Sequence, residues 1–324
     1  VQQVMAHHQF FGDRGDCIGV ERKAQRYRAS PALLLLAEHY GVTLKDCERH
    51  WRQERRHQPA KPVIISDLPK RTAGRKLRAE ELPLPSGSGA RKIIEEVKEA
   101  NSYLGKITFA GCDHPLLYRR FTCDFAYHGR WYGGVEHMPA EDRARVTING
   151  DGVCEVDVHA SHLTILHALA GLPLPASDLY GDFSFPRQVV KAWVTACIGN
   201  AGPPLRWSSE AKKRAAKQRG GRPGLNLSDY GVALVAAEVL ARYSFLADLP
   251  ALLGAEKEPR LTSHRLMALE AEALTEAMVS LRARGIPSLP IHDALMVRQH
   301  DAEAARMALS EAYQQRLGVM AVVR

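Results

Sequence analysis

Two stretches in the second half of the chain have apolar patterns that predict strands, and an aspartate stands at the end of each. Residues 153–158 alternate apolar and acidic side chains, which is the period of a half-buried strand, and Asp157 lies near its end. Apolar residues then recur at helical spacing over 161–171, which predicts a helix directly after Asp157. Further on, apolar pieces flank His292 and Asp293, which predicts a β-hairpin with these two residues at its tip. If the strands are neighbours, the two aspartates converge.

The rest of the pattern predicts a mostly helical chain with two regions. We expect a basic helical region over residues 1–100, with a linker rich in proline, glycine and serine at about 59–89, in which 63–65 could form a short strand, and a second region over 101–324. Helices are expected at 31–39, 45–56, 90–104, 261–284 and 302–316, with a helix pair in 226–253 and a short terminal strand at 319–323.

Composition narrows the class of protein. An apolar fraction of 45% allows a sizeable core, and no apolar run approaches the roughly 18 residues of a membrane span. The N-terminus lacks a secretory signal pattern, and the six cysteines are scattered without a CxxC pair, so we expect free thiols and a cytoplasmic location. A net charge of +8 favours a polyanionic partner but does not identify it.

Three motifs resemble those of template-copying polymerases. The sequence DVHASHLTILHALAG, starting at Asp157, resembles motif A of family A DNA polymerases, and IHDALMV, around Asp293, resembles their motif C. Between them, RQVVKAWVTACIGN carries Arg187 and Lys191 four residues apart and resembles motif B of these enzymes and of phage-type single-subunit RNA polymerases. The resemblance covers about residues 119–324 and extends to an uncharacterised polymerase-like family of bacterial and phage genomes. Three motifs in this order are more specific than any one alone.

The resemblance implies a fold and a reaction. The fold would be α+β, a right-hand polymerase palm with reduced fingers, in which an antiparallel palm sheet is packed with helices. The reaction would be nucleotidyl transfer to a nucleic-acid 3′ end by two-metal catalysis. Asp157 and Asp293, with the carbonyl of Val158, would hold Mg²⁺ or Mn²⁺, and Arg187 and Lys191 would bind the triphosphate.

Basic and aromatic residues predict contacts with DNA or RNA. The segment around 130–132 forms either a strand-binding strip or an ordinary hairpin with Trp131 in the core, and the basic segment 201–224 either touches strand phosphates or is a solvated arm. The candidate contacts are Arg130, Tyr132, His292, Lys212, Lys213 and Arg214. Nucleoside triphosphates and other replication proteins are the further partners that the resemblance implies, and no membrane is expected.

The chain departs from the family pattern where the sugar of the nucleotide is selected. His162 stands where family A DNA polymerases have a glutamate that helps to exclude ribose, and Gly199 stands where they have a tyrosine. Thr195 replaces an aromatic residue, and Ala294 follows the His-Asp turn in place of a glutamate. These changes predict relaxed sugar selection, as in a primase-like enzyme that uses both rNTPs and dNTPs.

Two other classes of function stay open. Glu155, Asp157, His159, His162 and His167 could ligate a metal in a nuclease or hydrolase, unless His167 is a core residue and His159 a turn residue. A non-catalytic nucleic-acid-binding protein on a polymerase-like scaffold is the third class. A hydrolase has no need of a triphosphate-binding pair such as Arg187 and Lys191, which favours the polymerase.

Overall fold

The computed structural model describes residues 31–42, 61–69, 71–72, 75–76, 79–217 and 224–324. The chain divides into two compact units, Val1–Gln58 and Pro59–Arg324. The described part of the first unit contains helix α1 (Pro31–His39), as the sequence predicted. The helix predicted at 45–56 lies outside the described residues.

A five-stranded antiparallel sheet lies at the centre of the second unit. Its order is β10-β11-β9-β8-β5, with bounds β10 (Leu289–Ile291), β11 (Ala294–Arg298), β9 (Asp151–Asp157), β8 (Thr147–Ile148) and β5 (Phe109–Ala110). Side chains of β9 alternate, so that Val156 is buried whereas Glu155 and Asp157 face outward. The predicted strand and hairpin are therefore confirmed, and they pair with each other directly.

A second sheet includes the segment that was expected to be a linker. Its order is β4-β1-β6-β7, with bounds β4 (Glu81–Leu82), β1 (Val63–Ser66), β6 (Tyr118–Thr122) and β7 (Asp124–Tyr132). A two-stranded ribbon, β2 (Arg71–Thr72) and β3 (Arg75–Lys76), lies between β1 and β4 in sequence. Because β1 pairs in parallel with β6, residues 59–89 belong to the larger unit. The chain thus divides after Gln58, earlier than the expected boundary at residue 100.

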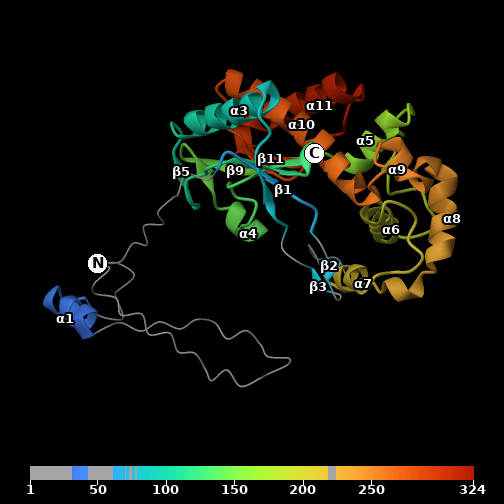
Figure 1. The fold of residues 1–324 in the computed structure, drawn as a ribbon, viewed down its shortest axis with the longest axis horizontal. Helices are drawn as coiled ribbons and strands as arrows, with labels where there is room; N and C mark the ends of the chain where they lie inside the picture. The colour runs from blue at the N-terminus through green and yellow to red at the C-terminus, as the bar shows by residue number, and fades with distance from the viewer. Residues whose placement is uncertain (1–30, 43–60, 70, 73–74, 77–78, 218–223) are drawn as a thin grey trace. The chain divides into compact units, whose positions relative to one another are not determined.

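Three long helices cover the sheets along one side (Figure 1). They are α3 (Ser88–Leu104), α10 (Thr262–Ala283) and α11 (Ala302–Leu317), close to the predicted ranges. Helix α11 packs on β9 and β11, and α10 packs on α11 and on β7. On β7, Trp131 is buried and its indole N–H donates to Thr275 Oγ1 of α10 at 2.8 Å. The alternative that placed Trp131 in the core is confirmed, so its ring is not a platform for stacking bases.

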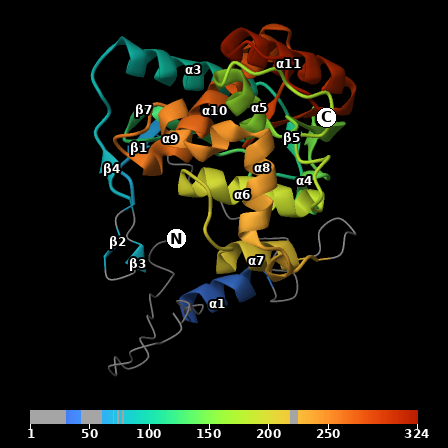
Figure 2. The same ribbon diagram turned by 90° about the vertical axis from the view of Figure 1, so that its right-hand side faces the viewer.

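A mostly helical part follows motif A in the chain, and Figure 2 shows α6 with α7 and α8 beside it. Helix α6 buries Val190, Trp193, Val194 and Cys197 at helical spacing, which fixes which of its faces stays open. The elements of this part are α5 (Ser161–Leu169), α6 (Arg187–Asn200), α7 (Ser209–Ala216), η1 (Leu227–Asp229), α8 (Val232–Arg242), η2 (Ser244–Ala247), α9 (Leu249–Leu252) and η3 (Pro259–Leu261). Elsewhere in the chain, α4 (Ala140–Arg143) precedes β8 and η4 (Gln299–Asp301) follows β11.

The ends of the chain and its cysteines add two details. Residues 319–323, expected as a strand, form only an isolated bridge between Val323 and Val158. The cysteines at 112, 123, 154 and 197 are free, as predicted, and those at 17 and 47 lie outside the described residues. In the described ranges, no helix combines the length and the apolar character that crossing a membrane requires.

Candidate active site

Asp157 and Asp293 lie side by side at one end of the five-stranded sheet. In the pairing of β9 with β11, Asp157 is opposite Ala294, and Asp293 directly precedes Ala294 in the turn from β10. Asp157 has an exposed surface, although neighbouring residues shield its carboxylate from part of the solvent, and Asp293 is partly buried. Two segments that are far apart in sequence therefore bring two carboxylates together, as the two motifs predicted.

The turn that carries Asp293 is tight. Ile291 pairs with Ala294, so His292 and Asp293 are the only residues of the hairpin loop. His292 has φ 55°, in the left-handed region that two-residue hairpins require but that side chains other than glycine seldom adopt. Conformations of this kind cost roughly 1–3 kcal/mol and persist where the surrounding structure holds them, often at functional sites.

The two carboxylates lie in an environment that favours a bound cation. Burial, followed by the negative charge of Asp293, raises the pKa of Asp157 to about 6, and Lys191 partly offsets this rise. Burial and the negative charge of Glu270 raise the pKa of Asp293, which Arg130 partly offsets. Adjacent carboxylates that repel each other are stabilised when a divalent cation binds between them.

The backbone carbonyl of Val158, directly after Asp157, is a further oxygen near the two carboxylates. Asp157 and His159 form the backbone hydrogen bonds that flank the bridge between Val158 and Val323. In antiparallel pairing, the residue between two such bonds directs its own N–H and C=O to the opposite side. The Val158 carbonyl thus points away from the C-terminal segment, to the side of β9 that carries β11.

The donors at this place are oxygen atoms of two carboxylates and one carbonyl, which fits Mg²⁺ or Mn²⁺. Both are hard cations that prefer oxygen, and Mg²⁺ is commonly held by one or two carboxylates together with substrate phosphates. Among the described residues, no three His, Cys, Asp or Glu side chains come together as a metal site.

A buried glutamate, Glu270, accepts hydrogen bonds from residues near the two aspartates. Glu270 of α10 is 1% exposed and accepts hydrogen bonds from Arg130 of β7 and, at 2.5 Å, from Ser161 Oγ of α5. His162 Nε2 lies 3.5 Å from Glu270 Oε1 and forms no hydrogen bond with any residue that the structure describes. Burial alone would raise the pKa of Glu270, but the charges of His162 and Arg130 and these hydrogen bonds lower it. Glu270 is therefore ionised, and its negative charge acts on both aspartates.

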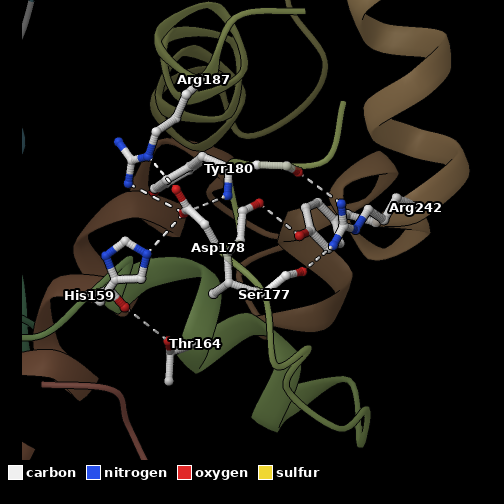
Figure 3. A network of polar contacts seen from close by, with 10 residues as sticks. His159, Thr164, Ser177, Asp178, Tyr180, Arg187 and Arg242 are labelled. Carbon is white, nitrogen blue, oxygen red and sulfur yellow. Dashed lines mark hydrogen bonds and ion pairs between the residues drawn. The ribbon is translucent and has the colours of Figure 1, made fainter. Parts of the chain in front are cut away.

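The two cations of motif B lie at the start of α6, one turn apart. The Arg187 guanidinium is 5.2 Å and the Lys191 ammonium 5.8 Å from the centre of the Tyr180 ring. Arg187 also forms an ion pair with Asp178, which the sequence analysis did not anticipate (Figure 3). Lys191 is exposed, and its charge acts on Asp157.

A groove of about 940 Å³ runs between α6 and α7. Arg187 and Lys191 line one wall with the small residues that follow them on the same helix face, Ala192, Thr195, Ala196 and Gly199. Helix α7 forms the other wall, and of its three candidate nucleic-acid residues only Arg214 lines the groove. Lys212 and Lys213 are exposed on the same helix, and Arg214 also pairs with Glu210.

The other predicted strand contacts lie along β7 and the hairpin tip. Arg130 is held by Glu270, with 16% of its side chain exposed, and so is less free than expected. Tyr132 is stacked on Tyr118, with ring centres 5.7 Å apart, and its hydroxyl is 2.8 Å from His128 Nε2. His292 is exposed beside Asp293. Roles in binding a strand stay predictions for these residues.

The metal cluster expected of a hydrolase is not formed. Glu155 pairs with Arg143, His159 Nε2 is 2.9 Å from Asp178, and His162 faces Glu270. His167 is buried, with Nδ1 bonded to the Leu163 carbonyl, and is a core residue as the alternative held. The side chains of Glu155, His159, His162 and His167 thus contact different residues, because strand, turn and helix point them in different directions.

Comparison with known proteins adds little. No family model matches the chain, and no curated protein matches it. One solved structure to which the chain is similar is the POL domain of Pol1 from M. smegmatis, in complex with DNA primer-template and dNTP. The TM-score is 0.33 at 14% identity, and the match covers 72% of this chain and 51% of that one, about half its length. A likeness this distant assigns neither a family nor an activity.

Proposed function

We propose that the protein is a nucleotidyltransferase of the polymerase type, which extends the 3′ end of a DNA or RNA strand with nucleoside triphosphates. The observation that carries the proposal is the pairing of β9 with β11, which sets Asp157 beside Asp293, with Lys191 near enough for its charge to act on Asp157. In this proposal the five-stranded sheet with α10 and α11 is the palm, and α6 to α8 are reduced fingers.

Each residue then has a role that its surroundings support. Asp157, Asp293 and the Val158 carbonyl would hold Mg²⁺ or Mn²⁺, which would supply activation of the 3′-hydroxyl and charge compensation for the triphosphate. Lys191 and Arg187 are cations fixed on one helix face, and they stabilise the negative charge that develops on the leaving pyrophosphate. The pKa of Asp157 is raised to about 6, so this carboxylate is mostly anionic near neutral pH, which is the form that binds a metal.

The proposal includes relaxed selection between ribose and deoxyribose. At Gly199 an added Cβ would meet nothing within 4 Å, so the groove wall holds no bulk there. The Thr195 hydroxyl donates a hydrogen bond to the Lys191 carbonyl at 2.7 Å, so this short side chain stays close to its own helix. With no large side chain at either position, little on this wall would reject a 2′-hydroxyl.

Nucleotide incorporation by the purified protein tests the proposal. Labelled dNTPs and rNTPs are offered separately, with Mg²⁺ or Mn²⁺, on primed and unprimed single strands. Asp157→Asn and Asp293→Asn should each reduce incorporation at least about 100-fold, the scale of losing a major electrostatic contribution to a transition state. Asp151→Asn, at the exposed start of the same strand, is the matched control and should keep wild-type activity.

Other outcomes would contradict the proposal in distinct ways. Strand cleavage that depends on Asp157 and Asp293, without incorporation, would identify a nuclease. Salt-sensitive strand binding without either activity would identify a non-catalytic binder.

A further inference from the structure

Asp178 lies in the segment between α5 and α6, and its carboxylate has more partners than Arg187 alone. Oδ1 is 2.9 Å from His159 Nε2 and accepts the backbone N–H of Tyr180 at 3.1 Å. Oδ2 accepts Arg187 Nε, and the Arg187 Nη2 is 3.4 Å from Oδ1. Figure 3 shows the carboxylate between His159 and Arg187. If Arg187 leaves, the other two contacts keep Asp178 hydrogen-bonded.

The segment itself is anchored to a different helix. Arg242 of α8 donates to the Gly181 carbonyl at 2.9 Å and to Ser177 Oγ at 3.3 Å, on both sides of Asp178. Burial alone would raise the pKa of Asp178, but the hydrogen bonds from Arg187, Tyr180 and His159 hold it well below its usual range. The carboxylate is thus a fixed anion, whereas Arg187 reaches it through a long flexible side chain.

The ion pair between Arg187 and Asp178 is one that another anion can replace. The side chains of Arg187 and Asp178 are 34% and 29% exposed, and ion pairs that are open to water contribute little to stability. Arg187 lines the groove with Lys191. Its guanidinium has five N–H donors, and Asp178 contacts only the Nε and Nη2 groups, so the remaining donors are available to a ligand. A triphosphate entering the groove would offer several anionic oxygens in place of one carboxylate.

Building on the nucleotidyltransferase function proposed above, we propose that Asp178 is a positioning residue that holds Arg187 in the nucleotide-free protein and releases it to the phosphates of the incoming nucleoside triphosphate. Asp178 acts as an internal anion that competes with the substrate. It keeps the guanidinium at the groove wall and lowers affinity for phosphates that cannot displace it. Because His159 is two residues after Asp157, the same carboxylate links the catalytic strand end to α6.

Binding of inorganic tripolyphosphate, measured by calorimetry with EDTA and without nucleic acid, tests this proposal apart from catalysis. Asp178→Asn keeps the shape of the side chain and removes its charge. It should tighten binding about tenfold, since a charge-assisted hydrogen bond no longer competes for Arg187. Asp178→Glu retains the anion and should restore affinity toward wild type. Asp182→Asn removes the same charge from an exposed position of the same segment and should change affinity less than about twofold.

A second background separates competition for Arg187 from a general effect of charge. In Arg187→Gln, the Asp178→Asn change should alter affinity less than about twofold, because there is no guanidinium to release. Weaker or unchanged binding in Asp178→Asn would overturn the proposal, as would an equal gain in Asp182→Asn or a gain that persists in Arg187→Gln. Failure to bind tripolyphosphate would overturn it too. None of these results touches the incorporation test with Asp157 and Asp293, and loss of that activity would leave the binding result standing.

Discussion

Replacing Glu270 with alanine removes an acceptor that Arg130 and Ser161 share inside the protein. Only 2% of the Glu270 side chain and 16% of the Arg130 side chain are exposed, so water cannot replace the lost partner. The same change removes a negative charge that lies 3.5 Å from His162 Nε2. The variant therefore leaves the mostly buried Arg130 guanidinium without its carboxylate, whereas the Ser161 hydroxyl keeps its hydrogen bond with the Tyr313 hydroxyl at 2.8 Å.

The expected loss of stability follows from this burial. Removing one partner of a buried ion pair typically costs about 3–5 kcal/mol. Arg130 is near Asp293, whose charge acts on it and offers partial compensation, so we take about 3 kcal/mol, the lower end of that range. At roughly 2–4 °C per kcal/mol for a unit of this size, Tm should fall by about 6–12 °C.

Thermal unfolding of Glu270→Ala and Glu276→Ala checks this reasoning. Glu276 is on the same helix and pairs with Arg316, but these side chains are 36% and 48% exposed, so its loss should cost at most about 1 kcal/mol. In the double variant Arg130→Ala/Glu270→Ala, the losses should fall short of additivity by about 2 kcal/mol. Equal Tm values for the two single variants, or strict additivity in the double variant, would refute the account of Glu270.

Three further predictions concern the site and a turn. Asp157→Asn should raise Tm at pH 7.5 and raise it less at pH 5. The pKa of Asp157 is raised to about 6 in the folded state, so the folded protein binds the proton more readily than the unfolded chain. The ionised carboxylate therefore destabilises the fold above that pH. An equal gain in Tm at both pH values would contradict this. Millimolar Mg²⁺ should raise Tm of the wild type by mass action but not that of Asp157→Asn/Asp293→Asn, and the same rise in both would argue against a metal there. Gly133→Ala should cost at least about 2 kcal/mol in urea unfolding, because its Cβ would be 2.0 Å from the Leu116 carbonyl oxygen, whereas Gly171→Ala, with φ also positive but open space, should cost about 1 kcal/mol. Similar losses at the two glycines would count against the close approach.

The sequence predicted the elements whose pattern is local. The alternation before Asp157 and the His292–Asp293 turn fixed β9 and the β10–β11 hairpin within a residue or two. The long amphipathic helix ending at Gly285 is α10. Because two strand ends and one turn determine where the aspartates lie, their meeting could be predicted before the pairing was known.

The network around the aspartates depends on contacts between distant segments, and it was missed. Glu270 did leave a signal, since it interrupts the apolar face between Leu266 and Leu274, where a charged residue needs a buried partner. No sequence signal marks Asp178, because it lies in a segment without hydrophobic periodicity. Its pairing with Arg187 depends on the path of that segment between α5 and α6. The pairing of β1 with β6 was hidden for the same reason, in a segment whose composition is typical of a linker.

The measurement that tests the central claim most directly is the stoichiometry of extension. Purified protein, Mg²⁺, a 5′-labelled strand and nucleoside triphosphates are combined, and both the lengthened strand and the released pyrophosphate are counted. The account predicts one pyrophosphate for each nucleotide added at the 3′ end, and neither product with Asp157→Asn or Asp293→Asn. Strands that shorten, or stay unchanged while Asp157 and Asp293 are intact, would contradict it.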